Sequence, residues 1–282
     1  MKLYLNLLFI FCFGLSLAQN KEFTYEYQFI SDSTNRKDVS TEIMILNIDK
    51  EKSHYYSFDK YISDSTIIAE TKKNVMVMPL PYKIVEMDIK DLKNKKISFE
   101  TKVGDAKYTV DQDVNLKWNL LNEFDEILNY KVQKATTEFG GRTWIAWFTK
   151  DIPIQDGPYK FHGLPGLILK IEDKTSSYKF VLKGIKNTKE PFEYPERKDD
   201  YFGKAKVDYS AYVKAYLQHR SDPAAHLIGR IPDQRDSEGN FRTGDQIIRE
   251  QRKMMLEKIS KDNNIIEIDI LKRESESKSK KQ

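Results

Sequence analysis

The chain has 282 residues, and 47 Lys and Arg against 43 Asp and Glu give a formal net charge of only +4. The opposite charges are interspersed along the sequence, which does not indicate a nucleic-acid-binding surface. Cys12 is the one cysteine, so the chain cannot build an intrachain disulfide framework. Its stability must therefore come from an ordinary hydrophobic core.

The first residues have the pattern of a cleaved signal peptide. Lys2 gives a positive start, residues 3–17 are almost wholly apolar, and Ser16 and Ala18 place small residues at the −3 and −1 positions of a cleavage site. The apolar run is shorter than the ~20 residues of a membrane-spanning helix. We therefore expect residues 1–18 to be removed and the mature protein to work in the periplasm or cell envelope, with no transmembrane segment.

The next part of the chain predicts many short strands. Residues 23–29 alternate aromatic and polar side chains with a period of two, as in a half-buried strand. Further short runs between polar turns are also predicted as strands: Ile43–Ile48, Tyr55–Phe58, Thr66–Ala69, Val75–Met78, Ile84–Met87, Lys96–Glu100, Lys107–Val110 and Asn115–Trp118. Such a series indicates a large antiparallel sheet.

A hairpin is predicted next, with strands Tyr130–Phe139 and Arg142–Thr149. The Gly-Gly pair between them can supply the positive φ angles that a two-residue loop needs. This register pairs Thr137 with Trp144, Ala135 with Ala146 and Lys134 with Trp147. Lys134 can then lie over the Trp147 ring.

A segment rich in glycine and proline follows the hairpin. Asp156-Gly157-Pro158 predicts a turn, and residues 164–167 suit a type II turn with Pro and Gly at the central positions. The strands Leu167–Ile171 and Tyr178–Ile185 are expected after this turn.

The last third of the chain predicts a polar and helical insertion at about residues 186–262. One helix has a stripe of tyrosine and aliphatic residues from Tyr209 to Leu217, and a second begins at a capping box of Thr243 and Gln246. Residues Ile265–Leu271 predict a closing strand, and residues 272–282 predict a disordered charged tail.

Together these elements predict an α+β, β-rich fold. We expect a single domain over residues 19–271, built on a large curved antiparallel sheet that can take a half-barrel form, with two helices near the C-terminal end.

No known catalytic or metal-binding pattern stands out in the sequence. The four histidines, His54, His162, His219 and His226, do not have the spacing of a metalloprotease site. There is no G-x-S-x-G nucleophile motif and no phosphate-binding glycine loop. The sequence therefore identifies no catalytic residue, and we predict no metal site and no cofactor.

Several motifs nevertheless resemble one family. Residues 130–136, 141–149, 152–153, 157–161 and 163–168 are similar to the GLPGLI family of exported bacterial proteins, which is named after the last of these motifs. The resemblance covers roughly residues 118–171 and implies a family of unassigned function, so it supplies no catalytic residue.

The chain departs from the family pattern at two places. Many members carry a cysteine where Val132 stands, so a thiol role there cannot apply to this chain. Members often have Asn-Pro-Ile-Glu near the end, where this chain has Asn264-Ile265-Ile266-Glu267.

We interpret the family motif as structural, because Gly and Pro fix turns and close approaches of the backbone. Its residues are Arg142, Trp147, Asp156, Gly157, Pro158, Gly163, Leu164, Pro165, Gly166, Leu167 and Ile168.

Two functional hypotheses follow. The first is a non-catalytic binding protein or outer-membrane assembly partner, with an apolar ligand or an outer-membrane protein as its partner and a concave apolar cavity as its sign. The alternative is a metal-dependent or other hydrolase of the envelope, which predicts His162 or His219 close to carboxylates in a cleft.

Overall fold

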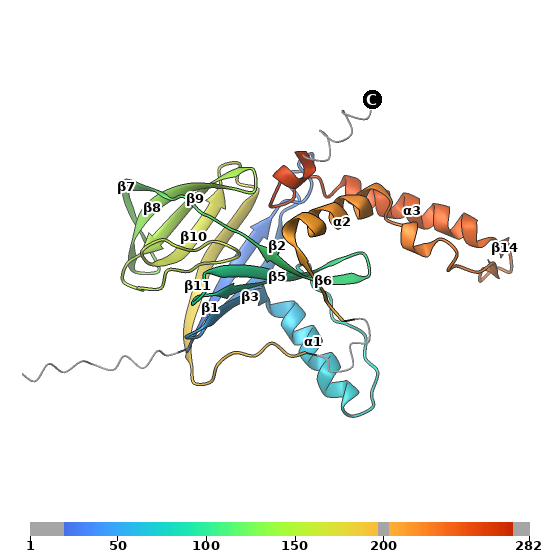
Figure 1. The fold of residues 1–282 in the computed structure, drawn as a ribbon, viewed down its shortest axis with the longest axis horizontal. Helices are drawn as coiled ribbons and strands as arrows, with labels where there is room; N and C mark the ends of the chain where they lie inside the picture. The colour runs from blue at the N-terminus through green and yellow to red at the C-terminus, as the bar shows by residue number, and fades with distance from the viewer. Residues whose placement is uncertain (1–19, 197–202, 273–282) are drawn as a thin grey trace, which may run out of the picture.

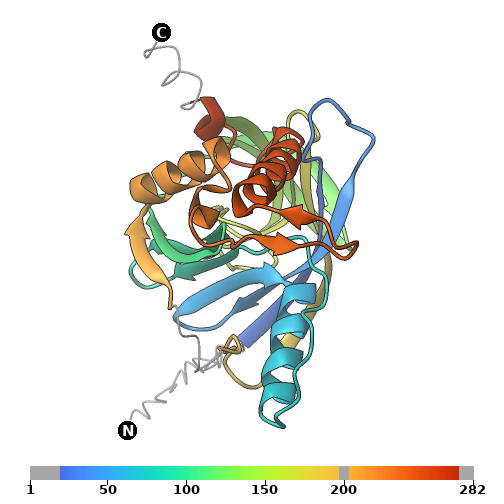
Figure 2. The same cartoon turned by 90° about the vertical axis from the view of Figure 1, so that its right-hand side faces the viewer.

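The protein is described by a computed structural model that covers residues 20–196 and 203–272 (Figures 1 and 2). The strands of its large sheet are β1 (Asn20–Phe29), β2 (Ser40–Ile48), β3 (Lys52–Ser57), β4 (Met87–Asp91), β5 (Lys96–Val103), β6 (Ala106–Gln112), β7 (Asn119–Ile127), β8 (Tyr130–Phe139), β9 (Arg142–Thr149), β10 (Leu167–Asp173), β11 (Tyr178–Thr188) and β12 (Ala205–Asp208). The remaining elements are α1 (Phe58–Thr71), α2 (Tyr209–Ser221), the short 3-10 helix Ala225–Leu227, the hairpin β13 (Gln234–Arg235) and β14 (Phe241–Arg242), and α3 (Gly244–Ser260).

The twelve strands form one open sheet in the order β12-β6-β5-β4-β3-β2-β1-β11-β10-β9-β8-β7. Neighbouring strands are antiparallel, except that β12 runs parallel to β6, so the sheet is mixed. Strands β7–β10 turn away from the direction of β1–β3, which gives the sheet its curvature (Figure 1). The predicted β-rich α+β fold is confirmed.

The hairpin β8–β9 has the bounds and the register that its sequence predicted. Thr137 faces Trp144, Ala135 faces Ala146, and Lys134 faces Trp147. Gly140 and Gly141 have φ angles of 61° and 78° in the two-residue turn, as the Gly-Gly pair requires. The Lys134 ammonium lies 5.7 Å from the centre of the Trp147 ring.

The main core fills one face of the sheet with side chains of the protein itself. Residues of the β9–β10 loop, among them Tyr159, Phe161 and Leu164, pack onto this face. The Phe161 and Trp144 rings lie 4.6 Å apart between centroids. The β9–β10 loop therefore covers this face of the sheet.

The opposite face of the sheet carries a smaller core under α1. Met44 and Leu46 belong to the main core, whereas Ile45 between them packs with Tyr56 and Met87 on the α1 side. The strand prediction for residues 66–69 is wrong, because these residues belong to α1. The helix begins where the Ser57 side chain accepts a hydrogen bond from the Lys60 amide.

Three other strand predictions are also wrong, and of the predicted strand Ile84–Met87 only Met87 lies in a strand, β4. Residues 75–78 and 115–118 have no regular secondary structure. Residues 265–271 do not close the sheet, but run through irregular backbone into a helical turn over residues 269–272. The two predicted C-terminal helices are α2 and α3, and α3 has the predicted capping box of Thr243 and Gln246.

Some predictions concern residues outside the described part of the chain. The predicted leader, residues 1–18, lies there, as does the tail apart from Lys272. Within the described ranges, none of the helices has the length and apolar character needed to cross a bilayer.

Candidate functional site

Strand β4 and the residues just before it lie between two polar regions. Val85 and Met87 line an open cleft on the α1 side of the sheet. Glu86, Asp88 and Lys90 alternate with them and belong to a buried cluster of charged groups on the other side. The period-two geometry of an extended chain thus separates a solvent-accessible site from an internal one.

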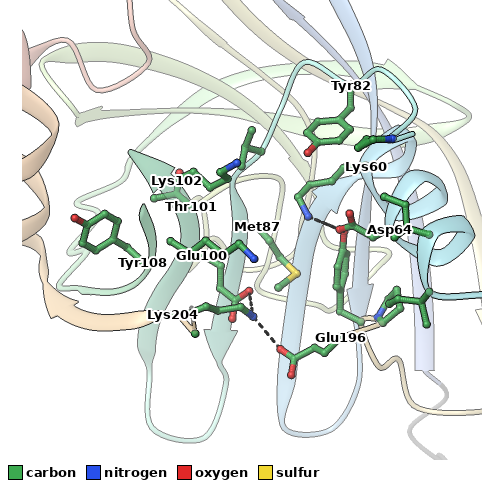
Figure 3. A pocket seen from close by; sticks show the side chains of 18 residues that line it. Lys60, Asp64, Tyr82, Met87, Glu100, Thr101, Lys102, Tyr108, Glu196 and Lys204 are labelled. Carbon is green, nitrogen blue, oxygen red and sulfur yellow. Dashed lines mark hydrogen bonds and ion pairs between the residues drawn. The ribbon is translucent and has the colours of Figure 1, made fainter. Parts of the chain in front are cut away.

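The cleft has a volume of about 640 Å³ and lies between α1, strands β4–β6 and the segment around Tyr194 (Figure 3). Its lining combines aliphatic, tyrosine, lysine and carboxylate side chains: Lys60, Asp64, Ile67, Ile68, Pro79, Tyr82, Val85, Met87, Glu100, Thr101, Lys102, Lys107, Tyr108, Tyr194, Pro195, Glu196, Gly203 and Lys204. No element of the sequence analysis pointed to it.

On the helix side of the cleft, one ion pair is enclosed by aromatic rings. Lys60 Nζ lies 2.5 Å from Asp64 Oδ2, and the Tyr194 hydroxyl donates to the same oxygen at 2.8 Å. The Lys60 ammonium lies 5.1 Å from the Tyr194 ring centre and 5.9 Å from that of Tyr82. Burial, and then the Asp64 carboxylate, raise the pKa of Tyr194, so its hydroxyl remains a donor.

On the strand side, lysines dominate the rim of the cleft. Lys204 Nζ contacts Glu100 at 2.6 Å and Glu196 at 2.9 Å (Figure 3). Lys102 and Lys107 are direct cross-strand partners on β5 and β6. Lys102 is exposed, so its ammonium group is open to solvent at this rim.

The buried cluster on the other side of β4 centres on Lys160 and Glu267. Lys160 is 1% exposed and lies 2.6 Å from Glu267 Oε1, which also accepts a hydrogen bond from Tyr159 at 2.6 Å. Glu267 Oε2 accepts from Gln112 at 3.0 Å and from the Tyr209 hydroxyl. Four donors thus satisfy one buried carboxylate, as burial of a charge requires.

These contacts control the charge state of the pair. Burial alone would raise the pKa of Glu267, but Lys160 and the hydrogen bonds from Tyr159 and Tyr209 outweigh it and lower that pKa. Burial likewise opposes the charged form of Lys160, yet the nearby carboxylates raise its pKa above the ordinary lysine value. Lys160 is therefore a fixed cation and not a nucleophilic amine.

Two further carboxyl groups share this interior. Asp88 is 1% exposed, while the Glu86 side chain is 24% exposed and lies 3.3 Å from Lys160 Nζ. Burial raises the pKa of both carboxyl groups, and for Asp88 the neighbouring Glu86 raises it further. Burial is the largest cause for both groups, because it disfavours the charged form of a carboxyl group.

Arg142 of the family motif joins the hairpin to the C-terminal segment. Its guanidinium donates to Asp173 at 3.1 Å, to the Asn264 side chain at 2.6 Å, and to the carbonyl oxygens of Ile265 and Ile266. The Asn-x-Ile-Glu segment is thereby held as irregular backbone. Arg142 and Glu267 connect two motifs that lie far apart in the sequence.

Asp156 of the motif forms an internal ion pair with Lys90 of β4. Asp156 is 2% exposed, and its Oδ1 contacts Lys90 Nζ, which also donates to the carbonyl oxygen of Gly157 at 2.7 Å. This pair fastens the β9–β10 loop to the sheet.

The glycines of the motif permit close approach between chain segments. A Cβ atom on Gly166, which has a φ of 155°, would lie 1.9 Å from the Thr149 carbonyl oxygen. A Cβ atom on Gly157 would lie 2.8 Å from the Ile168 side chain. Gly163 has a φ of 89°.

The other motif residues line the loop and the strand that follows it. Pro158, Leu164, Leu167 and Ile168 are buried, whereas Pro165 is exposed in the turn. Trp147 is half-buried below Lys134. None of the eleven motif residues lines the cleft.

The histidines do not form the site that the hydrolase hypothesis predicts. His162 Nδ1 contacts the Lys160 carbonyl oxygen at 3.0 Å, and burial lowers the pKa of its ring. His219 lies beside Gly104 and, like His162, has no carboxylate in hydrogen-bond contact. Over the described residues, no group of three or more His, Cys, Asp or Glu side chains could hold a metal ion.

Comparison with known proteins adds a family segment. Residues 140–170 match the family model described as "Protein of unknown function (Porph_ging)". The matched model describes a GLPGLI-type family, so this short segment is of the GLPGLI type. This match confirms the predicted resemblance over the Gly-Gly hairpin turn, β9 and the β9–β10 loop.

Among solved structures, the chain is similar to PNGF-II in a P21 and a C2 crystal form, with TM-scores of 0.48 and 0.47 and sequence identities of 18% and 20%. The similarity covers 72% of this chain but only 34% of PNGF-II. The chain thus spans about a third of the length of the solved structures it matches. No curated protein sequence matches it.

Proposed function

We propose that this protein is a non-catalytic protein of the periplasm or cell envelope that binds an anionic amphiphile in the cleft beside α1. The leader-like residues 1–18 support the location. The cleft supports binding, because about 640 Å³ is within the range of small-molecule sites.

The observation that carries the ligand class is Lys102, an exposed lysine in the lining of the cleft. A phosphate or carboxylate group in the cleft would pair with the Lys102 ammonium group. Ile67, Ile68 and Met87 line the same cleft and offer apolar surface to a hydrocarbon chain. An amphiphile fits this lining better than the purely apolar ligand that the sequence led us to expect.

The hydrolase alternative is less well supported by the geometry. A general acid or base must reach the substrate within hydrogen-bond distance. The carboxyl groups of Glu86 and Asp88, whose pKa values are raised, face the interior across β4 from the cleft. The expected outer-membrane protein partner stays a prediction.

Calorimetric titration with dodecyl phosphate and dodecyl maltoside, which share a tail but differ in head-group charge, tests the proposal. Dodecyl phosphate should bind with one-to-one stoichiometry below its micelle concentration. Lys102→Glu should weaken this binding about tenfold, which corresponds to about 1.4 kcal/mol. The control Lys131→Glu changes an exposed lysine on β8, away from the cleft, and should leave the affinity unchanged.

Two results would contradict the proposal. Equal binding of dodecyl maltoside would refute the anionic ligand class. Failure of both amphiphiles to bind would refute the cleft as an amphiphile site, and native mass spectrometry of protein purified from the cell envelope would show whether any ligand is retained.

A further inference from the structure

Lys90 and Asp156 form the most deeply buried oppositely charged pair among the ion pairs of the described residues. Lys90 belongs to β4, and Asp156 belongs to the β9–β10 loop of the GLPGLI-type segment. Their side chains are 3% and 2% exposed. The pair is independent of the cleft, because neither residue lines it.

The geometry holds the amine against the carboxyl group. Lys90 Nζ contacts Asp156 Oδ1 and donates to the Gly157 carbonyl oxygen at 2.7 Å, and the Gly157 amide donates to the same Oδ1 at 2.7 Å. Asp156 Oδ2 is buried and has no hydrogen-bond partner. Both charges are removed from water, so burying the pair as two ions is unfavourable.

Asp88 is the neighbouring buried residue on the same side of β4 as Lys90. It lies two residues before Lys90 on the same buried side of β4, and the charge of Lys90 acts on it. Burial and the Glu86 carboxylate raise the pKa of Asp88 well above its ordinary value, which favours the protonated acid. Asp88 Oδ1 is buried and has no hydrogen-bond partner within the described structure.

We propose that Lys90 and Asp156 condense to an intramolecular amide bond, with Asp88 as the proton relay. In the proposed step a proton passes from the Lys90 ammonium to the Asp156 carboxylate, and Nζ then attacks Cγ, so that the Nζ–Cγ bond forms. Asp88 takes a proton from the nitrogen and passes one to the leaving hydroxyl group. The Cγ–O bond then breaks, and one water molecule leaves.

The step balances without an oxidant or any further reactant. An ammonium and a carboxylate become an amide and water, so the net charge of the pair remains zero. The amide retains one N–H, which can still donate to Gly157. Two buried charges and the unpartnered oxygen of Asp156 disappear, and each of these is unfavourable in the interior.

The bond would give this protein a covalent constraint that its composition otherwise excludes. The chain has one cysteine, so no disulfide can form within it. The amide would join β4 to the loop after β9, which are distant in the sequence. A cross-link between distant residues restricts the unfolded chain and slows or prevents full unfolding.

Intact mass spectrometry of the full-length protein after export, purified and then denatured, tests the proposal. The position of leader cleavage is read from the N-terminal peptide. The measured mass should be lower than the sequence mass by one water molecule, and a protease digest should contain the Lys90 peptide joined to the Asp156 peptide. A mass equal to the sequence mass would overturn the proposal, as would a water loss located at another pair.

Variants identify the reacting groups. Asp156→Asn should form the same amide by loss of ammonia instead of water. Lys90→Arg retains the positive charge but should show no mass loss, and Asp88→Asn should leave most of the chain unreacted. Lys170→Arg is the matched control, because Lys170 forms a partly exposed ion pair with Glu172 and its replacement should leave the water loss intact.

Persistence of the mass loss in Lys90→Arg would refute the assigned bond, and complete reaction of Asp88→Asn would refute the relay. The measurement on the unaltered protein decides the main point even if a variant does not fold.

Discussion

The two sides of β4 use charged residues in different ways. On the inner side, Lys160 and Glu267 are almost fully buried, and their charged groups pair with each other at 2.6 Å. On the cleft side, Lys60 and Lys204 also form ion pairs, but their side chains are 18% and 30% exposed. Because solvent screens the second set and not the first, we expect the inner side to determine stability and the cleft side to remain available to a ligand.

Lys160→Met tests the inner side most severely. It leaves the Glu267 carboxylate buried without its cation, and we expect a loss of about 3–5 kcal/mol in the free energy of unfolding. Urea unfolding followed by tryptophan fluorescence measures this loss. The double variant Lys160→Met, Glu267→Gln should recover part of it, and a loss below about 1 kcal/mol in the single variant would show that the pair does not hold the interior together.

Gly166→Ala tests the close approach within the GLPGLI-type segment. Its new Cβ atom would lie 1.9 Å from a carbonyl oxygen of Thr149, so we expect more than about 2 kcal/mol of destabilisation in urea unfolding. Gly239→Ala is the matched control, because Gly239 also has a positive φ, 89°, but no atom lies within 4 Å of its added Cβ. It should cost only about 1–2 kcal/mol from backbone strain.

Glu86→Gln tests the pH dependence of the inner side. Burial raises the pKa of Glu86 above its ordinary value of 4.5, so the folded protein binds this proton more tightly than the unfolded chain does. The free energy of unfolding should therefore fall as the pH rises from 4.5 to the raised pKa, by at most about 1.4 kcal/mol per pH unit. Glu86→Gln should flatten this slope, measured by urea unfolding between pH 4.5 and neutral pH.

The matched control for this slope is Glu126→Gln on the exposed edge strand β7. An unchanged slope in Glu86→Gln would assign the proton uptake to another group.

Lys204→Met tests the cleft side and should have the smallest effect on stability. The side chain is 30% exposed, and its two ion pairs at the rim should contribute less than about 1 kcal/mol to the free energy of unfolding. Chemical denaturation of this variant and of Lys160→Met under identical conditions makes the comparison direct. Similar losses in both would remove the distinction between the two sides of β4.

Local patterns predicted much of the sheet and little of either polar region. The hairpin at residues 130–149 could be predicted in full, because the Gly-Gly turn and the cross-strand pairs depend on residues close in sequence. Helix α1 could not be predicted from local patterns, because Thr66, Ile67 and Ile68 favour strands. Packing of α1 on the Ile45–Tyr56 core overrode that preference.

The closing strand failed for a related reason. Ile265–Leu271 contains alternating apolar residues, but Arg142 and Tyr178 take up the carbonyl oxygens of residues 264–266 and hold them out of the sheet. Such long-range hydrogen bonds leave no mark in a local pattern.

The sequence showed some residues of the candidate sites, but not which of them meet in the folded protein. Asp156 and the Asn-x-Ile-Glu segment were visible as motifs, but Lys90 and Lys160 look like ordinary surface lysines in the sequence. Their burial follows from the folding of the β9–β10 loop onto the sheet. The cleft was missed because its lining comes from four segments that no periodicity connects.

The sequence by itself determined the leader pattern, the β-rich class and the register of β8–β9. It also determined which glycines allow two backbone segments to approach closely. Each of these features depends on residues that are neighbours in the sequence. Only the tertiary structure decided that Asp156 meets Lys90, that Glu267 meets Lys160, and that a cleft opens beside α1. These contacts join residues that are remote along the chain, and the free energy that selects them comes from packing the sheet, the loop and the C-terminal segment together.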